Sequence, residues 1–400
     1  MAAVHHTPDL DSISSGYTSH NRVTLIRGGA QYFDLLEELI DHAVHSVHFQ
    51  MYIMDHDETG QRVTAALRRA AFRNVRVYLL LDGYASADLD PRLVESLHEA
   101  GIHFRWFQPI LKGRHFYVGR RMHHKILVVD GLHSLVGGVN VSNRYNDLPG
   151  QPAWLDWAIR IDGEASVELF NRCVEMWTKS LWSKIGLHGL FNWRSVVAPE
   201  EEAFTRIRIN DWVRNKNQIS RSYLEMFHRA QEQITIMSSY FLPGRILRKH
   251  MNHAARRGVV IRIILTGRSD VKLSKSAERY LYPWFFDRNI EIYEYRHTVL
   301  HGKIAAYDRQ WATIGSYNVN NISAYASIEL NVDVYNRPFA SSVEDALDQI
   351  IYDDCTRITR SRFSRGTSIF SRAWHRIAFE LIRLIFYLFT FYFRQEARGR

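Results

Sequence analysis

The sequence predicts two α/β domains that repeat one another, followed by a basic amphipathic helix. Three observations lead to this fold class. A motif of His, Lys, Asp, Gly and Asn occurs twice, and each member is displaced by the same interval (301 − 123 = 178 and 318 − 140 = 178). Helix-like and strand-like stretches alternate in the same order around both copies, which is typical of layered α/β domains. Residues 357–400 carry most of the net basic charge of the chain.

The first repeat alternates helices and strands before its motif. Asp90 precedes Pro91, and Gly101 follows Ala100, which marks the two ends of a helix. Two short apolar runs hold the motif itself, Ile126–Val129 and Ser134–Val136. The expected helices are Tyr32–His42, Gly60–Ala71, Pro91–Ala100 and Ala165–Leu181, and the other expected strands are Ser46–Ile53, Val75–Leu81, His103–Phe107 and Trp157–Ile161.

The second repeat has the same order, with motif strands at Ile304–Tyr307 and Ala312–Ile314. Its expected helices are Ile219–Ala230, Ile246–Arg257, Ser276–Phe286 and Ser341–Tyr352, and its other strands are Gln233–Ser239, Val259–Leu265, Ile290–Tyr295 and Ile328–Val334. A hydrophobic content of 46% over 400 residues suits two domains with separate cores. Irregular sequence over Gly186–Glu202 predicts the connection between them. We expect a polar N-terminal arm (1–21), a first domain (22–195), a second domain (196–356) and a tail (357–400).

Each motif has the form His-x-Lys-x-x-x-x-Asp followed by Gly-(Gly/Ser)-x-Asn. A His and a Lys two positions apart in a strand project from the same face. Two such halves facing each other would hold a phosphate diester between two Lys and two Asn, while one His attacks phosphorus and the other protonates the leaving oxygen. The first copy is His123, Lys125, Asp130, Gly137, Gly138 and Asn140, and the second is His301, Lys303, Asp308, Gly315, Ser316 and Asn318.

Some motif residues have simpler interpretations. Asp130 and Asp308 stand at strand ends, where a carboxylate suits the holding of the following turn, so we expect them to be structural. A single buried His in a strand is more often a hydrogen-bonded core residue than a catalyst, but the duplication with Lys and Asn reverses that preference. The arrangement implies no metal and no cofactor, and Cys173 and Cys355 lack the spacing of a metal site.

The duplicated motif resembles the signature of the phospholipase D superfamily. The resemblance implies two phospholipase D-like α/β domains related by pseudo-two-fold symmetry, with a cleft between them and transfer through a covalent phosphohistidine. It implies that His123 is the nucleophile and His301 the acid and base, although local symmetry leaves their order open. It also implies a supporting carboxylate downstream of each imidazole, Asp156 in the first copy and Glu329 in the second. A solvated acid at a strand end is the alternative for each.

Several segments resemble bacterial cardiolipin synthases of the type without N-terminal transmembrane helices. The resemblance implies transfer of a phosphatidyl group from one phosphatidylglycerol to another, with release of glycerol. Glu164 after Gly163, and the sequence over 320–323, depart from the family pattern and put the acceptor in question. A hydrolytic phosphodiesterase acting on phospholipid or nucleic acid is the alternative, and a catalytically silent membrane scaffold is a third hypothesis. The matching segments outside the motifs are Arg27–Phe33, Met51–Ile53 before Asp57, and Ser239–Pro243.

Two further segments are candidates for the mouth of the cleft. Pro109–Arg121 is rich in Gly and basic residues and is expected to be a loop. Its Arg121 is a candidate phosphate ligand, with solvated surface Arg as the commoner outcome. Tyr240 and Phe241 are candidate aromatic lips, although a core aromatic pair explains them almost as well.

The charge and the apolar pattern of the C-terminal tail predict the kind of partner that the protein binds. Residues 357–400 contain ten Arg and no Lys against Glu380 and Glu396, which gives +8 of the total +9. The catalytic domains therefore have a net charge near +1 (9 − 8), so no nucleic acid is expected as a partner. Polar residues recur every three or four positions over Trp374–Phe393, while the uncharged run Leu384–Phe393 is too short to span a bilayer.

We therefore expect the tail to be a helix lying in the membrane interface on an anionic phospholipid surface, and a terminal helix packed on its own domain is the alternative. Met1–His20 lacks the apolar core of a secretory signal, and two Cys fit a reducing compartment. These features predict a peripheral protein on the cytoplasmic face of the cell membrane. They leave the oligomeric state open.

Overall fold

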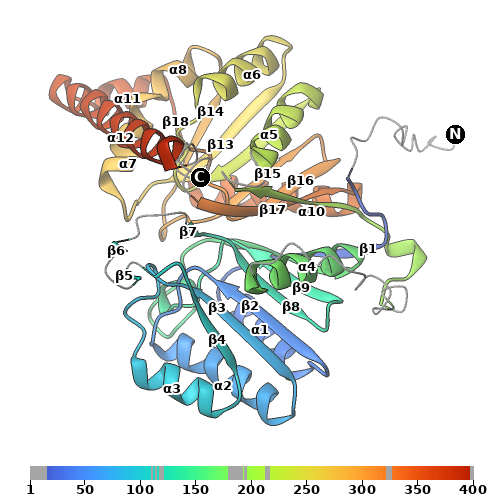
Figure 1. Cartoon of the computed structure of the whole chain (residues 1–400). Coiled ribbons are helices and arrows are strands. Elements are labelled where there is room, and N and C mark those ends of the chain that lie inside the picture. Colours follow the sequence, from blue (N-terminus) through green and yellow to red (C-terminus); the bar gives the residue numbers. More distant parts are fainter. Residues whose placement is uncertain are drawn as a thin grey trace, which may run out of the picture.

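The computed structural model describes residues 16–109, 111–112, 115–116, 121–178, 192, 196–211, 217–320 and 327–396. The chain forms two α/β domains, each built on a mixed sheet, and a C-terminal helix lies on the outer side of the second domain (Figure 1). These features confirm the predicted fold class. The domain limits stay predictions, and much of the expected connection, including residues 186–191, lies outside the described residues.

Seven strands form the sheet of the first domain. They are β1 (Asn21–Arg27), β2 (Ser46–Met51), β3 (Arg76–Asp82), β4 (His103–Phe107), β8 (Lys125–Val129), β9 (His133–Gly137) and β10 (Trp157–Gly163). Their order is β1-β10-β9-β8-β2-β3-β4. β2, β3 and β4 run parallel, and the other neighbours are antiparallel. The first motif thus occupies the β8–β9 hairpin in the middle of the sheet.

The second domain repeats this order in a larger sheet. Its strands are β11 (Phe204–Asn210), β12 (Gln233–Ser238), β13 (Val260–Thr266), β14 (Glu291–Tyr295), β15 (Lys303–Tyr307), β16 (Trp311–Gly315), β17 (Ser327–Tyr335) and β18 (Cys355–Ile358). The order β11-β17-β16-β15-β12-β13-β14-β18 is that of the first sheet with β18 added. β7 (Arg121–Met122) joins β17 from the first domain, and β5 (Leu111–Lys112) pairs separately with β6 (His115–Phe116).

Helices form two outer layers and one shared inner layer (Figure 1). The outer face of the first sheet is covered by α1 (Ala30–Asp41), α2 (Glu58–Phe72) and α3 (Pro91–Glu99). The outer face of the second is covered by α5 (Gln218–Arg229), α6 (Arg245–Arg256), α7 (Lys272–Tyr280) and α8 (Tyr282–Phe286). Between the sheets lie α4 (Glu164–Thr178) and α10 (Arg337–Asp354), which share one buried cluster with both sheets. A continuous core therefore fixes the two domains against each other.

Two differences from the predicted elements have clear physical causes. The helix expected over Ser276–Phe286 is two helices, α7 and α8, because the helix is interrupted at Leu281. Pro283 then occupies the first turn of α8, where a proline is tolerated. The periodicity does not predict the edge strands β1 and β11, since their extended form comes from pairing with β10 and β17. These two strands complete both sheets.

Asp130 and Asp308 have the same structural role in the two domains. The Asp130 carboxylate accepts hydrogen bonds from the backbone N–H groups of Val44, His45 and Ser46 at 2.7–2.9 Å. Asp308 does the same for residues 231–233 at 2.7–3.0 Å. These carboxylates hold the segments that enter β2 and β12, and not the turn that follows them in sequence as predicted. Sequence proximity misled the prediction because the partners lie across the sheet.

The tail continues from β18 into α11 (Arg360–Gly366) and then into α12 (Ile369–Glu396). One face of α12 packs on α7, where Ala378 and Ile382 are buried in the core of the second domain. The Phe379 and Tyr280 rings lie 4.7 Å apart at the same contact. The tail is therefore helical as predicted, and this stretch of it packs on its own domain. No helix in the described part of the chain is long and apolar enough to cross a bilayer.

Candidate active site

The two motifs meet at the boundary between the domains through a reciprocal pair of backbone contacts. The His123 N–H donates to the carbonyl of Ile328 at 2.9 Å, and the His301 N–H donates to the carbonyl of Leu155 at 2.7 Å. Ile328 and Leu155 each immediately precede a predicted carboxylate. A pseudo-two-fold axis thus relates the halves, and each motif is anchored to the strand or strand entry of the other domain.

The supporting carboxylates pair with the histidines crosswise. His123 Nδ1 lies 2.8 Å from Glu329 Oε2, and His301 Nδ1 lies 2.6 Å from Asp156 Oδ2. The expectation that each carboxylate serves the histidine upstream in its own copy is therefore wrong. Both carboxylates are fully buried, so the alternative of a solvated acid is also wrong. Each imidazole Nδ1 is directed at a carboxylate from the other domain, which leaves Nε2 as the nitrogen that can react.

The two lysines are buried beside the imidazoles. Lys125 Nζ donates to the His123 carbonyl at 2.5 Å, and Lys303 Nζ lies 2.8 Å from His301 Nδ1. Burial, together with the charge of Lys303, lowers the pKa of Lys125 to about 7. Burial lowers the pKa of Lys303 to about 8 despite the nearby Asp156 and Glu329 carboxylates. Both ammonium groups have little hydration, so an anionic ligand bound between them would stabilise their charged form.

The two histidines differ in side-chain exposure, and the pKa of each is lowered. The side chain of His123 is 16% exposed and that of His301 is 8% exposed. Burial and the Lys303 charge lower the pKa of His301 to about 4, and burial also lowers the pKa of His123 although Glu329 opposes the shift. Both imidazoles are therefore neutral at neutral pH in the absence of ligand. A neutral imidazole with Nδ1–H held by a carboxylate is a nucleophile at Nε2.

The motif asparagines are held by their amide oxygens. Asn140 Oδ1 accepts from the Ile53 N–H at 3.2 Å, and Asn318 Oδ1 accepts from the Ser239 hydroxyl at 2.8 Å. Both side chains are buried. Because the oxygen ends are engaged, the orientation of each amide is fixed by its own domain.

The Gly/Ser position of the motif meets the supporting carboxylate differently in the two halves. A Cβ at Gly138 would lie 2.3 Å from Asp156 Oδ1, so no side chain fits there. The equivalent Ser316 donates its hydroxyl to Glu329 Oε2 at 2.5 Å. Glu329 thus has a hydroxyl donor in addition to His123, whereas Asp156 has the Trp157 N–H at 2.8 Å in addition to His301. The two half-sites are related but not equivalent.

Aromatic rings that sequence reasoning did not assign to the site flank both imidazoles. The Tyr52 ring lies 4.6 Å from His123, and the rings of Tyr145 and Trp154 lie 5.1 and 6.2 Å from His301. Tyr52 stands in a segment that matched the family, but its position beside the imidazole requires the folded sheet. These rings restrict the space around each histidine.

The expected lips of the cleft are only partly supported. Phe241 is completely buried in the core of the second domain, so its prediction as a lip is wrong. Tyr240 is half-buried, and its hydroxyl bonds Asp270 at 2.7 Å. The Arg121 guanidinium contacts the Gln108 carbonyl at 2.6 Å and Asp82 at 3.4 Å. Its role as a phosphate ligand stays a prediction, and residues 110, 113–114 and 117–120 of the expected mouth loop lie outside the described residues.

The lysine pKa values predict how anion binding depends on pH. Sulfate keeps its charge between pH 6 and 9, whereas Lys125 and Lys303 lose their protons as the pH rises through about 7 and 8. The lysine charge is present below these values, so sulfate should bind at least about tenfold more weakly at pH 9 than at pH 6. Isothermal titration calorimetry measures this dissociation constant. An unchanged constant over that range would contradict the lowered lysine pKa values.

Comparisons with known proteins agree with this geometry. The sequence matches the family described as "Cardiolipin synthase, PLD-like domain" over residues 36–168 and 223–351. It is 32% identical over 369 residues to "Cardiolipin synthase B" of Salmonella typhi, covering 88% of this chain and 86% of that protein. It is 32% identical to the protein of the same name from Escherichia coli K12, covering 87% of this chain and 84% of that protein.

A solved structure with a similar fold is the phosphatidylserine synthase of Haemophilus influenzae Rd KW20. The TM-score is 0.70 at 15% identity, and the match covers 92% of this chain and 95% of that one. At this identity the likeness supports the fold of the two domains. The sequence matches show the family: the chain belongs to the cardiolipin synthase family of the phospholipase D superfamily.

Proposed function

We propose that this member of the family transfers the phosphatidyl group of one phosphatidylglycerol to a hydroxyl of a second, forming cardiolipin and releasing glycerol through a phosphohistidine. The observation that carries the proposal is the crossed pair of imidazole–carboxylate contacts at the domain boundary. It leaves the Nε2 atom of each imidazole free of its carboxylate, and Lys125 and Lys303 are buried beside the two histidines. Family membership supports the choice of phospholipid as substrate.

In the first step, His123 Nε2 attacks phosphorus while the bond from phosphorus to the glycerol oxygen breaks. His301 Nε2 donates a proton to that oxygen, so glycerol leaves as a neutral alcohol. His301 must be protonated for this step although its pKa is about 4 in the free protein. An anionic diester between Lys125 and Lys303 offsets their charge and raises the fraction of protonated His301. Substrate binding therefore prepares the acid.

In the second step, neutral His301 accepts a proton from a hydroxyl of the acceptor lipid. The acceptor oxygen attacks phosphorus, the bond to His123 Nε2 breaks, and His301 again carries the proton that it donated in the first step. Water can replace the acceptor, in which case phosphatidic acid forms. The hydrolytic alternative therefore uses the same residues and differs only in what reaches the second step.

Product analysis separates the two functions. The purified protein is incubated with phosphatidylglycerol vesicles, and the lipids are quantified by mass spectrometry. Cardiolipin should exceed phosphatidic acid, because aromatic side chains crowd the histidines and the acceptor is concentrated in the bilayer. Added glycerol should drive the reaction backward. If phosphatidic acid predominates in densely packed vesicles, the hydrolase replaces the synthase as the function.

We also propose that α12 docks on an anionic membrane surface, with its buried face on α7 and its other face toward lipid. Apolar side chains on that other face remain open to solvent: Phe370 83%, Trp374 49%, Ile377 51%, Leu381 41% and Leu384 53% exposed. Their spacing of three or four residues places them along one stripe. The tail's excess of Arg supplies the attraction to acidic lipid. The cytoplasmic face stays a prediction from cysteine content.

Substitution of this stripe tests the docking better than deletion, since deletion would uncover the core contacts of Ala378 and Ile382. The triple variant Ile377→Ser, Leu381→Ser, Leu384→Ser should bind phosphatidylglycerol vesicles at least about tenfold more weakly, because each buried apolar side chain contributes about 1.5 kcal/mol or more. Vesicle co-sedimentation measures this. Turnover of a short-chain soluble diester should stay unchanged.

The matched control replaces two exposed apolar residues far from the tail, Val44→Ser and Phe72→Ser, which are 66% and 73% exposed. This control should bind vesicles like the wild type. Equal vesicle binding by the triple variant and the control would show that α12 is not the docking element.

A further inference from the structure

We infer that a basic pocket beside His301 holds the phosphate of the acceptor lipid. The inference rests on the proposed function and names the part of the acceptor that the protein recognises, an alcohol that carries its own phosphodiester. The pocket has a volume of about 690 Å3 and lies where the domains meet. One wall is the end of β1 and the start of α1 together with residues 152–156, and the other is formed by the end of β14 and the residues that follow β13 and β14.

The pocket and the reacting centre share a wall. Leu155 and Asp156 line the pocket, while the Leu155 carbonyl accepts from His301 N–H and Asp156 holds His301 Nδ1. Trp154 lines it as well and lies 6.2 Å from the His301 ring, measured between ring centroids. His301 is not itself among the residues that line the pocket, so a lipid whose phosphate lies there would have to extend its glycerol hydroxyl past Leu155 and Trp154 to reach His301 Nε2.

Positive charge dominates the pocket once internal contacts are counted. The Asp147 carboxylate already accepts from the N–H groups of Ala30 and Ala153. Within the described residues, the Arg27 guanidinium forms no hydrogen bond or ion pair, and that of Arg268 has a single contact, at 3.4 Å to the His297 carbonyl. Both arginines therefore retain donors for phosphate oxygens, which planar guanidinium groups bind well.

Arg296 lines the pocket with a different role. Its Nη2 donates to the Asp353 carbonyl at 2.6 Å and its Nε to the Asp354 carbonyl at 3.3 Å. It thereby fixes the end of α10 against the residues after β14 and contributes charge without being free to move. The two residues to test are consequently Arg27 and Arg268, one from each domain.

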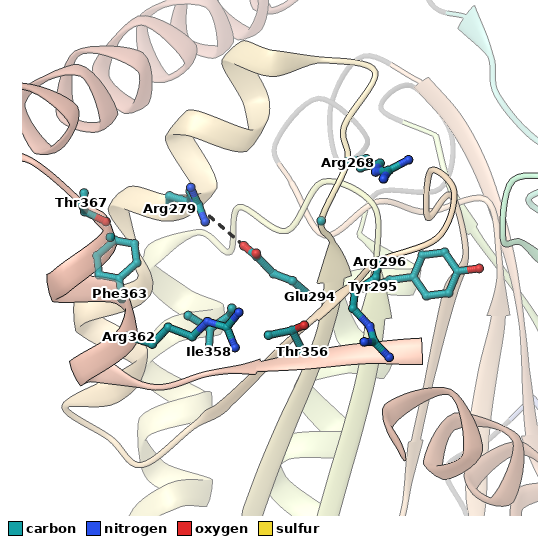
Figure 2. Close-up of a pocket in the computed structure, with 12 residues that line it drawn as sticks. Arg268, Arg279, Glu294, Tyr295, Arg296, Thr356, Ile358, Arg362, Phe363 and Thr367 are labelled. Carbon is teal, nitrogen blue, oxygen red and sulfur yellow. Dashed lines mark ion pairs between the residues drawn. The ribbon is translucent and has the colours of Figure 1, made fainter. Parts of the chain in front are cut away.

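A second pocket indicates that the anion arrives as a lipid headgroup. A neighbouring pocket of about 350 Å3 shares Arg268, Tyr295 and Arg296 with the first. Its lining side chains are drawn in Figure 2. It adds Arg279 and Arg362, and Arg279 lies 3.5 Å from Glu294. Arg362 belongs to α11 in the tail, so basic side chains extend from the tail through the second pocket to Arg268 in the first pocket. A headgroup entering from a membrane bound by α12 meets them in that order, which favours a lipid phosphate over free phosphate.

The test separates acceptors with and without a phosphate. The variant Arg27→Gln, Arg268→Gln is assayed on phosphatidylglycerol vesicles in two reactions, cardiolipin formation and exchange of labelled glycerol into phosphatidylglycerol. Exchange uses the same phosphohistidine but an acceptor without phosphate. Cardiolipin formation should fall about tenfold or more through loss of charge-assisted contacts, and exchange should stay within about twofold. The matched control Arg92→Gln, Arg256→Gln removes two exposed charges elsewhere and should change neither rate.

Each other outcome overturns the assignment. Equal losses in both reactions would show that the arginines bind the donor lipid or support folding. Two unchanged rates would show that the pocket has no role in transfer. If inorganic phosphate binds the variant more weakly while cardiolipin formation is unchanged, the pocket takes free phosphate and not the acceptor. A wild-type protein that exchanges glycerol but forms no cardiolipin refutes the proposed function itself, and in that case the variant is not needed to decide.

Discussion

His123→Ala and His301→Ala should each lower the turnover of phosphatidylglycerol at least about 100-fold, which is the usual effect of removing a group that transfers protons or forms the covalent bond. Both steps need both imidazoles, because one carries the phosphatidyl group and the other moves the proton each time. The rate of glycerol release measures turnover. Retention of more than about a tenth of the wild-type rate by either variant would contradict the shared centre.

The neighbouring His124 provides the control. Its Nε2 lies 2.9 Å from Gln50 Oε1 in the core of the first domain, and burial lowers its pKa to about 3. His124→Gln should keep turnover within about tenfold of wild type, a loss that a structural side chain can cause. Circular dichroism verifies that each variant is folded. The pair of adjacent histidines thus separates a side chain at the centre from one behind it.

The same variants decide which histidine is the nucleophile. A diester with a nitrophenol leaving group needs no acid for the first step, so His301→Ala should still become phosphorylated and then stall. Mass spectrometry of a quenched digest should locate the phosphoryl group on His123. A label on His301 in the His123→Ala variant would reverse the order of the two roles.

The sequence predicts most of the fold because local periodicity and the repeat agree. Alternating helices and strands, the cap at Asp90 and the motif hairpins all appear where expected. Edge strands β1 and β11 were missed because their conformation depends on neighbours distant in sequence. The bounds of a helix or strand can be predicted from hydrophobic periodicity only where that local pattern determines the conformation.

The site shows the same limit more sharply. Repetition singles out the histidines, lysines and asparagines, whereas it gives no information about which domain supplies a carboxylate. The crossed pairing arises because the His123 and His301 backbones bond to the other domain. Phe241 was misplaced because an aromatic residue at a strand exit suits a core as well as a lip. The pocket of Arg27 and Arg268 joins residues 241 positions apart (268 − 27), which no spacing rule reveals.

Glu329→Gln and Asp156→Asn should each lower turnover about 100-fold or more, since the carboxylate fixes the tautomer of its imidazole and stabilises the imidazolium. The crossed geometry adds a readout that a general loss of activity would not give. In Glu329→Gln the pKa of His123 should fall further, because the carboxylate that raises it is gone. In Asp156→Asn the pKa of His301 should fall below about 4 by the same cause.

Nuclear magnetic resonance of the histidine rings measures both pKa values in each variant. Under crossed pairing, Glu329→Gln should lower the pKa of His123 more than that of His301, and Asp156→Asn should lower the pKa of His301 more than that of His123. Each of these pairs joins residues of different domains. Pairing within a motif copy would give the opposite assignment and would refute the crossed geometry. Neither histidine has its carboxylate unless the two domains are together, as they are held by the shared core between the sheets. The active centre therefore exists only in the assembled pair of domains, even though every motif residue is present in one half or the other.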